Sequence, residues 1–391
     1  MENSKLLEIA KSCATKYAAE ELEVLKRMVS IDSGTGDIEG NAKVVAVAEE
    51  VLSRIKGVQI ERHFAEGYGT HLVARLRPEN PTGTIVLNCH LDTVFQKGDN
   101  EKFPFRVEGD TMYGLGAVDC KGGFVVSAYA VRCAQEAGVL PNKEILMIYN
   151  CDEEVGSPSG YPFFEKVARN VEAAFMYEPS RDNNGVLTSR KGIIQFEIQV
   201  KGRSAHAGVN YLAGASATME LAHKLLALRE KNIPEKNIFF NVADLKSSEK
   251  NNVVPEYASA SGSVRVSNEE ENLLVRSILA EVEQDTLIEG TASTIQVTSF
   301  GYPMPRNEGN LRLYEFVRKA GAIMGQDLPE QASGGSGDAG WFSYHGVPSV
   351  DALGPYMYKI HATDESGKVS SIEEKTALSI IILGLIDSEW K

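Results

Sequence analysis

The amino-acid sequence predicts an α/β fold in which a mostly parallel sheet with flanking helices is split by an inserted α+β segment with an antiparallel sheet. In the first part of the chain, apolar strand-like runs alternate with helical segments, a pattern typical of parallel sheets. Near Gly192 the pattern changes to strands that alternate apolar and polar residues, as half-exposed strands do. We therefore expect a main domain in two parts, 1–192 and 305–391, around an inserted domain, 193–304.

The individual elements follow from the spacing of apolar residues. In the main domain we expect helices at 5–30, 41–55 and 121–135, with strands at 71–76, 84–89, 144–150 and 173–177. In the inserted domain we expect strands at 193–200, 237–245, 258–266 and 294–300, with helices at 214–231 and 269–287. The main domain then resumes with a helix at 311–324, a buried strand at 349–353 and an amphipathic helix at 372–388.

The composition is that of an ordinary globular protein. The chain has 391 residues, of which 43% are hydrophobic and 24% charged, and its formal net charge is -14. A nucleic-acid partner is not expected, because binding to phosphates requires clustered Lys and Arg. No apolar stretch has transmembrane length and the first residues lack the apolar core of a signal peptide, so we expect no membrane partner and a cytoplasmic location.

The cysteines do not predict a disulfide framework. There are five of them, an odd number, and no CxxC motif occurs. Cys89, Cys120 and Cys151 lie close to acidic residues or a histidine and could act as soft metal ligands. We favour the simpler interpretation that they are small buried hydrophobic residues.

Candidate metal ligands follow the carboxyl ends of several expected strands, where ligands gather in open α/β sheets. These residues are His90 and Asp92, Asp152 to Glu154, Glu178 and His361, together with Asp119 at the start of a helix. His90 could bind a metal while Asp92 fixes its tautomer, or it could be a buried histidine beside an unrelated turn. Glu153 and Glu154 could be a general base and a ligand, or an acidic helix N-terminus.

Several other catalytic classes are disfavoured. The GxG before Asp119 lacks the third glycine of a dinucleotide-binding loop, and Asp119 could instead cap a helix. The sequence contains no GxSxG, no HExxH and no GxxxxGK[ST]. A serine hydrolase, a helix-type single-zinc protease and a P-loop enzyme are therefore not expected.

An ordered set of motifs covers nearly the whole chain. NCHLDTVF, GLGAVDCKGG, CDEEVGSPSG, YEPS, GRSAHAG, GGSGDAG and the HATDE that starts at His361 occur in this order. The set resembles the di-zinc carboxypeptidase and aminoacylase family, which includes glutamate carboxypeptidase, acetylornithine deacetylase and succinyl-diaminopimelate desuccinylase. The similarity is greatest to the glutamate carboxypeptidase branch.

The resemblance implies two divalent metal ions about 3.5–4 Å apart, with a water held between them. Asp119 would bridge the ions; His90 and Glu178 would complete one site, and Glu154 and His361 the other. Zinc is the expected ion, and cobalt or manganese would suit the same ligands. The resemblance also implies a cis peptide bond between Asp119 and Cys120.

It further implies the catalytic groups. Glu153 would be the general base that activates the bridging water, and Asp92 would stand behind His90. The inserted domain would be a lid and dimerisation domain, and its His206 would reach across a homodimer to stabilise the oxyanion. The alternative for His206 is a histidine in a turn.

Three further positions would bind the substrate. Asn252 and Arg265 would hold its free carboxylate, and the loop around Gly335 could receive an anion on its backbone N–H groups. From the residues alone, an arginine on a strand such as Arg265 would more often be a surface charge, and the glycine loop could equally be a flexible turn. Gly185 stands where a lysine is expected in glutamate-specific enzymes, so the resemblance does not extend to a preference for glutamate; Arg181, Arg190 and Lys191 are the candidate replacements.

The sequence thus predicts a metal-dependent hydrolase that cleaves the amide bond beside a C-terminal amino acid in a small peptide or N-acyl amino acid. An N-acyl amino acid deacylase or a dipeptidase of the same family is one alternative. A catalytically silent binding protein on the same fold is another, of a different class.

Overall fold

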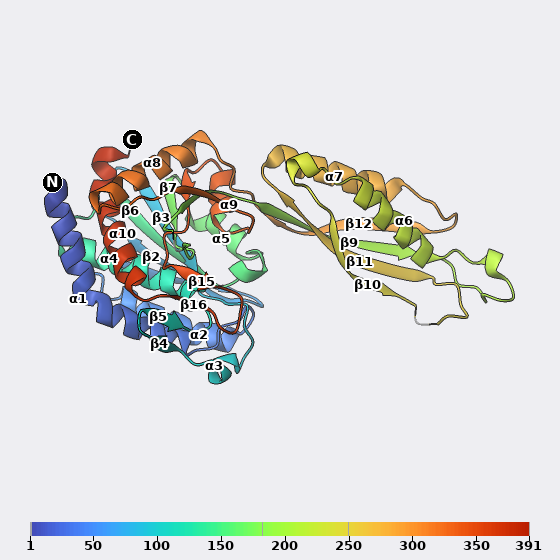
Figure 1. Ribbon diagram of the computed structural model, residues 1–391, viewed down its shortest axis with the longest axis horizontal. Helices are drawn as coiled ribbons and strands as arrows, with labels where there is room; N and C mark the ends of the chain where they lie inside the picture. Colours follow the sequence, from blue (N-terminus) through green and yellow to red (C-terminus); the bar gives the residue numbers. More distant parts are fainter. Residues whose placement is uncertain (1, 182, 249, 391) are drawn as a thin grey trace. The chain divides into compact units, whose positions relative to one another are not determined.

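The computed structural model describes residues 2–181, 183–248 and 250–390, which form two compact units. Unit 2 comprises Arg190–Pro305 and Gly334–Ser336, and unit 1 comprises the other described residues. The two units appear in Figure 1, coloured along the chain. The α/β class is confirmed by their sheets; the exact domain boundaries expected from the sequence remain predictions.

Unit 1 is built on a six-stranded sheet in the order β1-β2-β6-β3-β7-β14. Four strands run parallel: β6 (Glu144–Asn150), β3 (Thr84–His90), β7 (Val171–Met176) and β14 (Ser349–Val350). A hairpin of β1 (Gln59–Ala65) and β2 (Gly69–Leu76) adds two antiparallel strands at one edge. Strand β1 was not expected from the sequence, because its charged and half-exposed residues are those of an edge strand.

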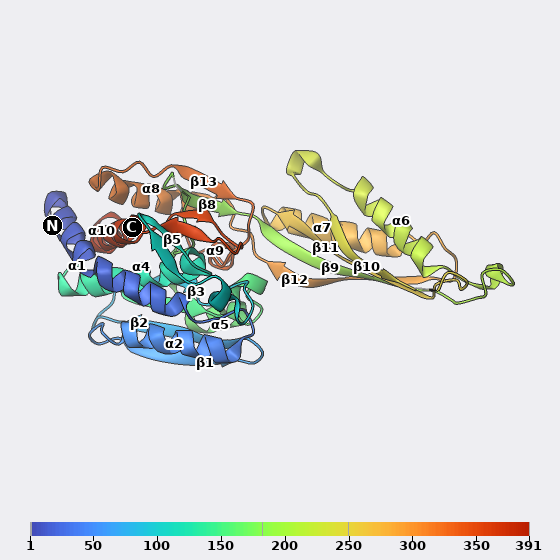
Figure 2. The ribbon, with the colours of Figure 1, turned by 60° about the horizontal axis from the view of Figure 1, so that its bottom comes forward.

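Three long helices of unit 1 pack on one another: α1 (Asn3–Val29), α4 (Gly122–Glu136) and α10 (Ser370–Glu389) (Figures 1 and 2). The remaining helices are α2 (Ile38–Leu52), α3 (Asp99–Lys102), α5 (Gly160–Val167), α8 (Glu308–Ile323) and α9 (Ala339–Tyr344). The expected amphipathic character of 372–388 is wrong. Helix α10 is buried on nearly all sides, including Lys375 and Ser379, because α1, α4 and α8 all pack against it.

Short strands complete unit 1. A four-stranded sheet joins β15 (Met357–Lys359), β16 (Ser366–Lys368), β5 (Thr111–Tyr113) and β4 (Arg106–Glu108), and β8 (Val186–Arg190) pairs with β13 (Glu330–Ser333). Most of these strands have three residues, too few to show a periodicity in the sequence. The β15-β16-β5 pairing nevertheless matters, because it joins the segment near His361 to the segment before Asp119.

Unit 2 is an antiparallel sheet in the order β10-β11-β9-β12, with two helices over one face (Figure 2). The strands are β9 (Gly192–Lys201), β10 (Asn241–Ser247), β11 (Tyr257–Val266) and β12 (Ala292–Gly301), and the helices are α6 (Ala217–Glu230) and α7 (Glu269–Gln284). Phe196, Val264 and Val275 belong to the core between sheet and helices. Strand β10 begins later than expected, because Asn237 has a positive φ of 54° after a short 3-10 turn.

Among the residues that the structure describes, no helix combines the length and the apolar character needed to cross a membrane.

Candidate metal centre

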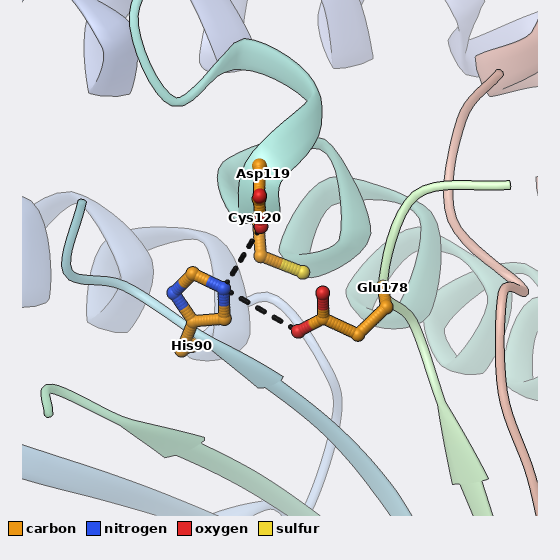
Figure 3. A group of neighbouring side chains, drawn as sticks. All are labelled: His90, Asp119, Cys120 and Glu178. Atoms are coloured by element: carbon orange, nitrogen blue, oxygen red, sulfur yellow. Dashed lines mark hydrogen bonds and ion pairs between the residues drawn. The ribbon is translucent and has the colours of Figure 1, made fainter. Parts of the chain in front are cut away.

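The carboxyl ends of the parallel strands bring the expected ligands together. His90 is the last residue of β3, Glu178 lies just beyond β7, and Glu154 lies just beyond β6. Asp119 lies in the turn Ala117–Lys121 that precedes α4. Figure 3 shows His90, Asp119 and Glu178 converging from these separate elements.

The first cluster is buried around His90. Its Nε2 atom lies 3.1 Å from Oδ1 of Asp119 and 3.3 Å from Oε1 of Glu178 (Figure 3). The side chain of His90 is fully buried. One imidazole nitrogen and two carboxylates thus face a common point.

The second cluster uses the other oxygen of Asp119. Nε2 of His361 lies 3.2 Å from Oδ2 of Asp119 and 3.2 Å from Oε2 of Glu154. His361 is about half exposed, and its φ of 55° is an uncommon conformation for a residue other than glycine. Asp119 therefore directs one oxygen to each histidine.

The spacing of these atoms fits metal ions. Nitrogen and oxygen ligands about 2.0–2.1 Å from a tetrahedral zinc ion are about 3.3–3.4 Å from one another. The interatomic distances of 3.1–3.3 Å in the two clusters are close to that value. Histidine with carboxylates is also a ligand set that zinc, manganese and cobalt accept.

The carboxylates of the two clusters also favour a positive charge at this site. Hydrogen bonds to Asp119 and Glu154 raise the pKa of His361 to about 10. Burial alone would lower the pKa of His90, but Glu178 and the hydrogen bond to Asp119 raise it well above its usual range. Both imidazoles therefore favour a positive charge among the carboxylates, which is the charge that a divalent cation would supply.

The turn that carries Asp119 is fixed by Glu365, which was not among the expected site residues. Glu365 accepts hydrogen bonds from the backbone N–H groups of Gly116 at 2.9 Å, Val118 at 3.0 Å and Asp119 at 3.3 Å. Glu365 lies four residues after His361 and closes the HATDE motif, so the motif itself contained the signal. The expected cis peptide bond between Asp119 and Cys120 is present.

Cys120 lies beside the first cluster, but its thiol is engaged elsewhere. The Sγ atom donates to the backbone carbonyl of Tyr177 at 3.1 Å, and burial raises the pKa of this thiol well above its usual range. A protonated thiol is a poor metal ligand. The five cysteines are free, and all but Cys13 are buried.

Asp92 connects His90 to the acidic turn. Its Oδ1 atom lies 3.4 Å from Nδ1 of His90, which also faces the Asp92 carbonyl at 3.1 Å. The same carboxylate accepts the backbone N–H groups of Glu153 at 3.2 Å and Glu154 at 3.3 Å. Asp92 therefore orients both the imidazole and the turn with the two glutamates.

The two glutamates face different histidines. Oε2 of Glu153 lies 4.0 Å from Nε2 of His90, whereas Glu154 contacts His361. Burial, followed by the charge of Glu178, raises the pKa of Glu153 well above its usual range. This arrangement leaves Glu153 beside the clusters without a short contact to either histidine.

A buried network holds the acidic turn from behind. Asp338 accepts hydrogen bonds from Asn150, at 2.6 Å, and from Ser157, which flank the turn on both sides. Asp338 is only 4% exposed, and burial raises its pKa to about 7. Asp338 belongs to the GGSGDAG motif, from which only Gly335 was expected to contribute to the site.

The other expected site residues lie in unit 2. His206 is exposed, and its Nδ1 accepts the backbone N–H of Gly208 at 3.2 Å. The neighbouring Ala207 donates its N–H to the carbonyl of Asn252 at 2.9 Å, so the two segments that carry His206 and Asn252 are joined. Arg265 is exposed on β11, and Gly335 lies in the segment Gly334–Ser336.

Two of the three basic residues that could replace a lysine at position 185 already donate hydrogen bonds to other groups. A Cβ atom at Gly185 would lie 2.3 Å from the side chain of Gln331, so a lysine there would displace that side chain. Arg190 donates to the carbonyl of Ser336 at 2.9 Å, and Lys191 donates to Ser267. Arg181 is exposed.

Comparisons with known proteins found similar sequences and a similar structure. The sequence model of the family described as "Peptidase family M20/M25/M40" matches residues 86–380. Carboxypeptidase G2 from Pseudomonas sp. (strain RS-16) is 29% identical over 359 residues, covering 89% of this chain and 85% of that protein. Succinyl-diaminopimelate desuccinylase from Dinoroseobacter shibae is 27% identical over 336 residues, covering 80% of this chain and 86% of that protein.

A solved structure shows the same fold. The M20 family metallo-carboxypeptidase Sso-CP2 from Sulfolobus solfataricus superposes with a TM-score of 0.75 at 17% identity, covering 94% of this chain and 99% of that chain.

Proposed function

The chain belongs to peptidase family M20/M25/M40, and on that premise we propose that it hydrolyses the amide bond beside a C-terminal amino acid in a small peptide or N-acyl amino acid. The observation that carries the proposal is the division of the Asp119 carboxylate between His90 at 3.1 Å and His361 at 3.2 Å. One carboxylate shared by two ligand clusters is the arrangement that a pair of metal ions needs.

We assign His90, Asp119 and Glu178 to one ion and Asp119, Glu154 and His361 to the other. When bound, two divalent ions would polarise the scissile carbonyl and lower the pKa of water at the site. Zinc is the proposed ion, with cobalt and manganese as alternatives for the same donor set.

Glu153 would be the general base. Its carboxylate lies 4.0 Å from Nε2 of His90 but is not among the four ligand contacts described above, so it is available to a water molecule. It would accept a proton from the attacking water and return it to the nitrogen of the leaving amine. Asp92 would keep the Nδ1–H tautomer of His90, so that Nε2 faces the metal.

Residues of unit 2 would complete the site. His206 would stabilise the oxyanion, Asn252 and Arg265 would hold the free carboxylate, and the backbone at Gly335 would receive an anion. The exposure of His206 and Arg265 supports these roles, because both side chains are accessible to a substrate.

A homodimer through unit 2 belongs to the same proposal. In the described part of the chain, β10 lies at the edge of its sheet and pairs with β11. Leu245 on this strand is 61% exposed, and Met219 and Leu226 on α6 are also exposed. An edge strand with exposed apolar neighbours is suited to pairing with a second copy. A cytoplasmic location remains a prediction.

Two alternatives make different predictions. A deacylase of N-acyl amino acids is favoured by the similarity to a succinyl-diaminopimelate desuccinylase, and a dipeptidase would share the same metal centre. A silent binding protein would be expected to lack a ligand or the base, whereas His90, Asp119, Glu153, Glu154, Glu178 and His361 are all present.

The test is a substrate screen on protein loaded with zinc, cobalt or manganese. Peptides and N-acyl amino acids with different C-terminal residues would be compared, with and without a chelator. Chelator-sensitive release of a C-terminal amino acid supports the proposal. Absence of hydrolysis by protein that holds two ions per chain would support the binding protein instead.

A further inference from the structure

A cavity of about 540 Å³ opens in unit 1 next to the metal centre. Glu154, a proposed ligand, lines it together with Val155 and residues of the loops 34–37 and 93–97. Pockets for small molecules typically measure about 300–1,000 Å³. The cavity therefore has room for a substantial part of a substrate.

The loops around the cavity are tied to each other and to the metal centre. The backbone N–H of Thr35 donates to the carbonyl of Thr93 at 3.1 Å, and that of Thr93 donates to Ser33 at 3.0 Å. The Thr35 hydroxyl donates to Asp92 at 2.6 Å, and Asp92 also accepts the N–H of Glu154. The cavity wall is thus held in a fixed position relative to Glu154.

The wall presents apolar side chains that are unusually accessible. Val94 is 38% exposed and Val155 is 47% exposed, and both line the cavity together with Phe95. Exposed apolar side chains that gather in a cavity gain free energy when an apolar ligand covers them.

The charged side chains that line the cavity are Asp37, Lys97 and Glu154. Lys97 donates to Glu39 at 3.1 Å, and Asp37 accepts the backbone N–H of Gly40 at 3.0 Å as the cap of α2. Two of the three charged lining residues, Asp37 and Glu154, are acids, and the single cation, Lys97, is exposed and shared with Glu39. An anionic ligand group would therefore lose water against the apolar wall and meet more negative than positive charge.

We propose that this cavity binds the acyl side of the substrate and selects an uncharged acyl group with an apolar body, such as benzoyl, over a charged one, such as succinyl. The inference rests on the proposed function. The scissile carbonyl has two substituents, and the groups assigned to the amino acid carboxylate lie in unit 2. The acyl substituent is thus left for the cavity that shares Glu154 with the metal centre.

The experiment compares kcat/KM of the zinc-loaded protein for N-acetyl, N-succinyl and N-benzoyl derivatives of one amino acid. The wild-type order should be benzoyl above acetyl and succinyl. Val94→Asp should lower the benzoyl-to-acetyl ratio about tenfold, since single changes in an apolar pocket alter selectivity by about 10–200-fold. Val107→Asp is the matched control: Val107 is 41% exposed on β4 and does not line the cavity, so the ratio should not change.

Equilibrium binding gives a second readout. Calorimetry with benzoate, the acyl product, should show weaker binding to Val94→Asp and to Val94→Lys than to the Val107→Asp control. Two valine variants of opposite charge keep the test valid if one of them fails to fold.

The outcomes separate the two proposals. A wild-type preference for succinyl, or an unchanged benzoyl-to-acetyl ratio in folded Val94 variants, overturns the assignment of the cavity while hydrolysis itself persists. If the metal-loaded wild type cleaves none of the N-acyl amino acids or peptides, the proposed function fails and the acyl assignment fails with it.

Discussion

Oε1 of Glu365 accepts the backbone N–H of Asp119 at 3.3 Å, across 246 positions of the chain. Both carboxylate oxygens of Glu365 accept N–H groups of the Asp119 turn. Because His361 lies only four residues earlier, Glu365 couples the placement of two proposed ligands. Glu365 is not one of the proposed metal ligands. Its substitution should nevertheless weaken metal binding.

Glu365→Gln should weaken metal binding about 10–100-fold, as expected for the loss of a group that orients a ligand. The amide of glutamine has a single acceptor oxygen, so its NH₂ group would face one of the N–H donors of the turn. Metal affinity would be measured by competition with a chelator. Glu108→Gln, a change at an exposed residue paired with Arg106, is the control; equal affinity of both variants would contradict the role of Glu365.

Glu153→Ala should retain both metal ions and lose about 10²–10⁴-fold in kcat, because the proton acceptor is removed while the ligands stay. The measurements are metal content and turnover of the same preparation. Turnover close to that of the wild type would remove Glu153 from the role of general base.

Mixing inactive variants tests whether His206 acts in the partner's site. In a dimer of Glu153→Ala with His206→Ala, one of the two sites would combine an intact Glu153 with an intact His206. Activity should therefore return after subunit exchange. The control mixture, Glu153→Ala with Glu154→Ala, should stay inactive because each site then lacks one group. Failure of the first mixture to recover, with exchange demonstrated, would argue against action in trans.

We expect the stability of the fold to depend on pH through Glu21, a residue outside the metal centre. This fully buried residue of α1 accepts the Thr376 hydroxyl at 2.8 Å, and its Oε2 has no hydrogen-bond partner among the described residues. Burial raises its pKa to about 8, and the charges of Glu373 and Glu20 add to the shift. A pKa raised on folding favours the protonated form, so stability should fall as the pH rises from about 4.5 to 8.

Glu21→Gln removes this titration. The variant should resemble the wild type near pH 5 and be more stable near pH 8, by about 3–5 kcal/mol at most. Urea unfolding at the two pH values measures the difference, and Glu23→Gln, an exposed change on the same helix, is the control. An equal effect of Glu21→Gln at both pH values would show that Glu21 does not titrate in this way.

The parallel strands and the ligand set could be predicted from sequence because each signal was local. Apolar runs such as Ile145–Met147 identified β6, and the ligand types followed directly at the strand ends. Asp119 was harder, since no strand precedes it; the resemblance supplied its role.

What the sequence did not indicate depends on contacts between distant segments. Glu365 and Asp338 act through hydrogen bonds to the backbone or to side chains far along the chain, and neither lies at the end of an expected strand. Lys375 is likewise buried because neighbouring helices cover nearly all sides of α10. The spacing of apolar residues in the sequence cannot reveal those neighbours. Such residues become visible only when the fold is known.

Anomalous diffraction from crystals of the zinc-loaded protein tests the central claim most directly. We predict two peaks about 3.5–4 Å apart, one on each side of the Asp119 carboxylate, between His90 and His361. A single peak, or peaks elsewhere in the molecule, would contradict a centre in which Asp119 joins two ions.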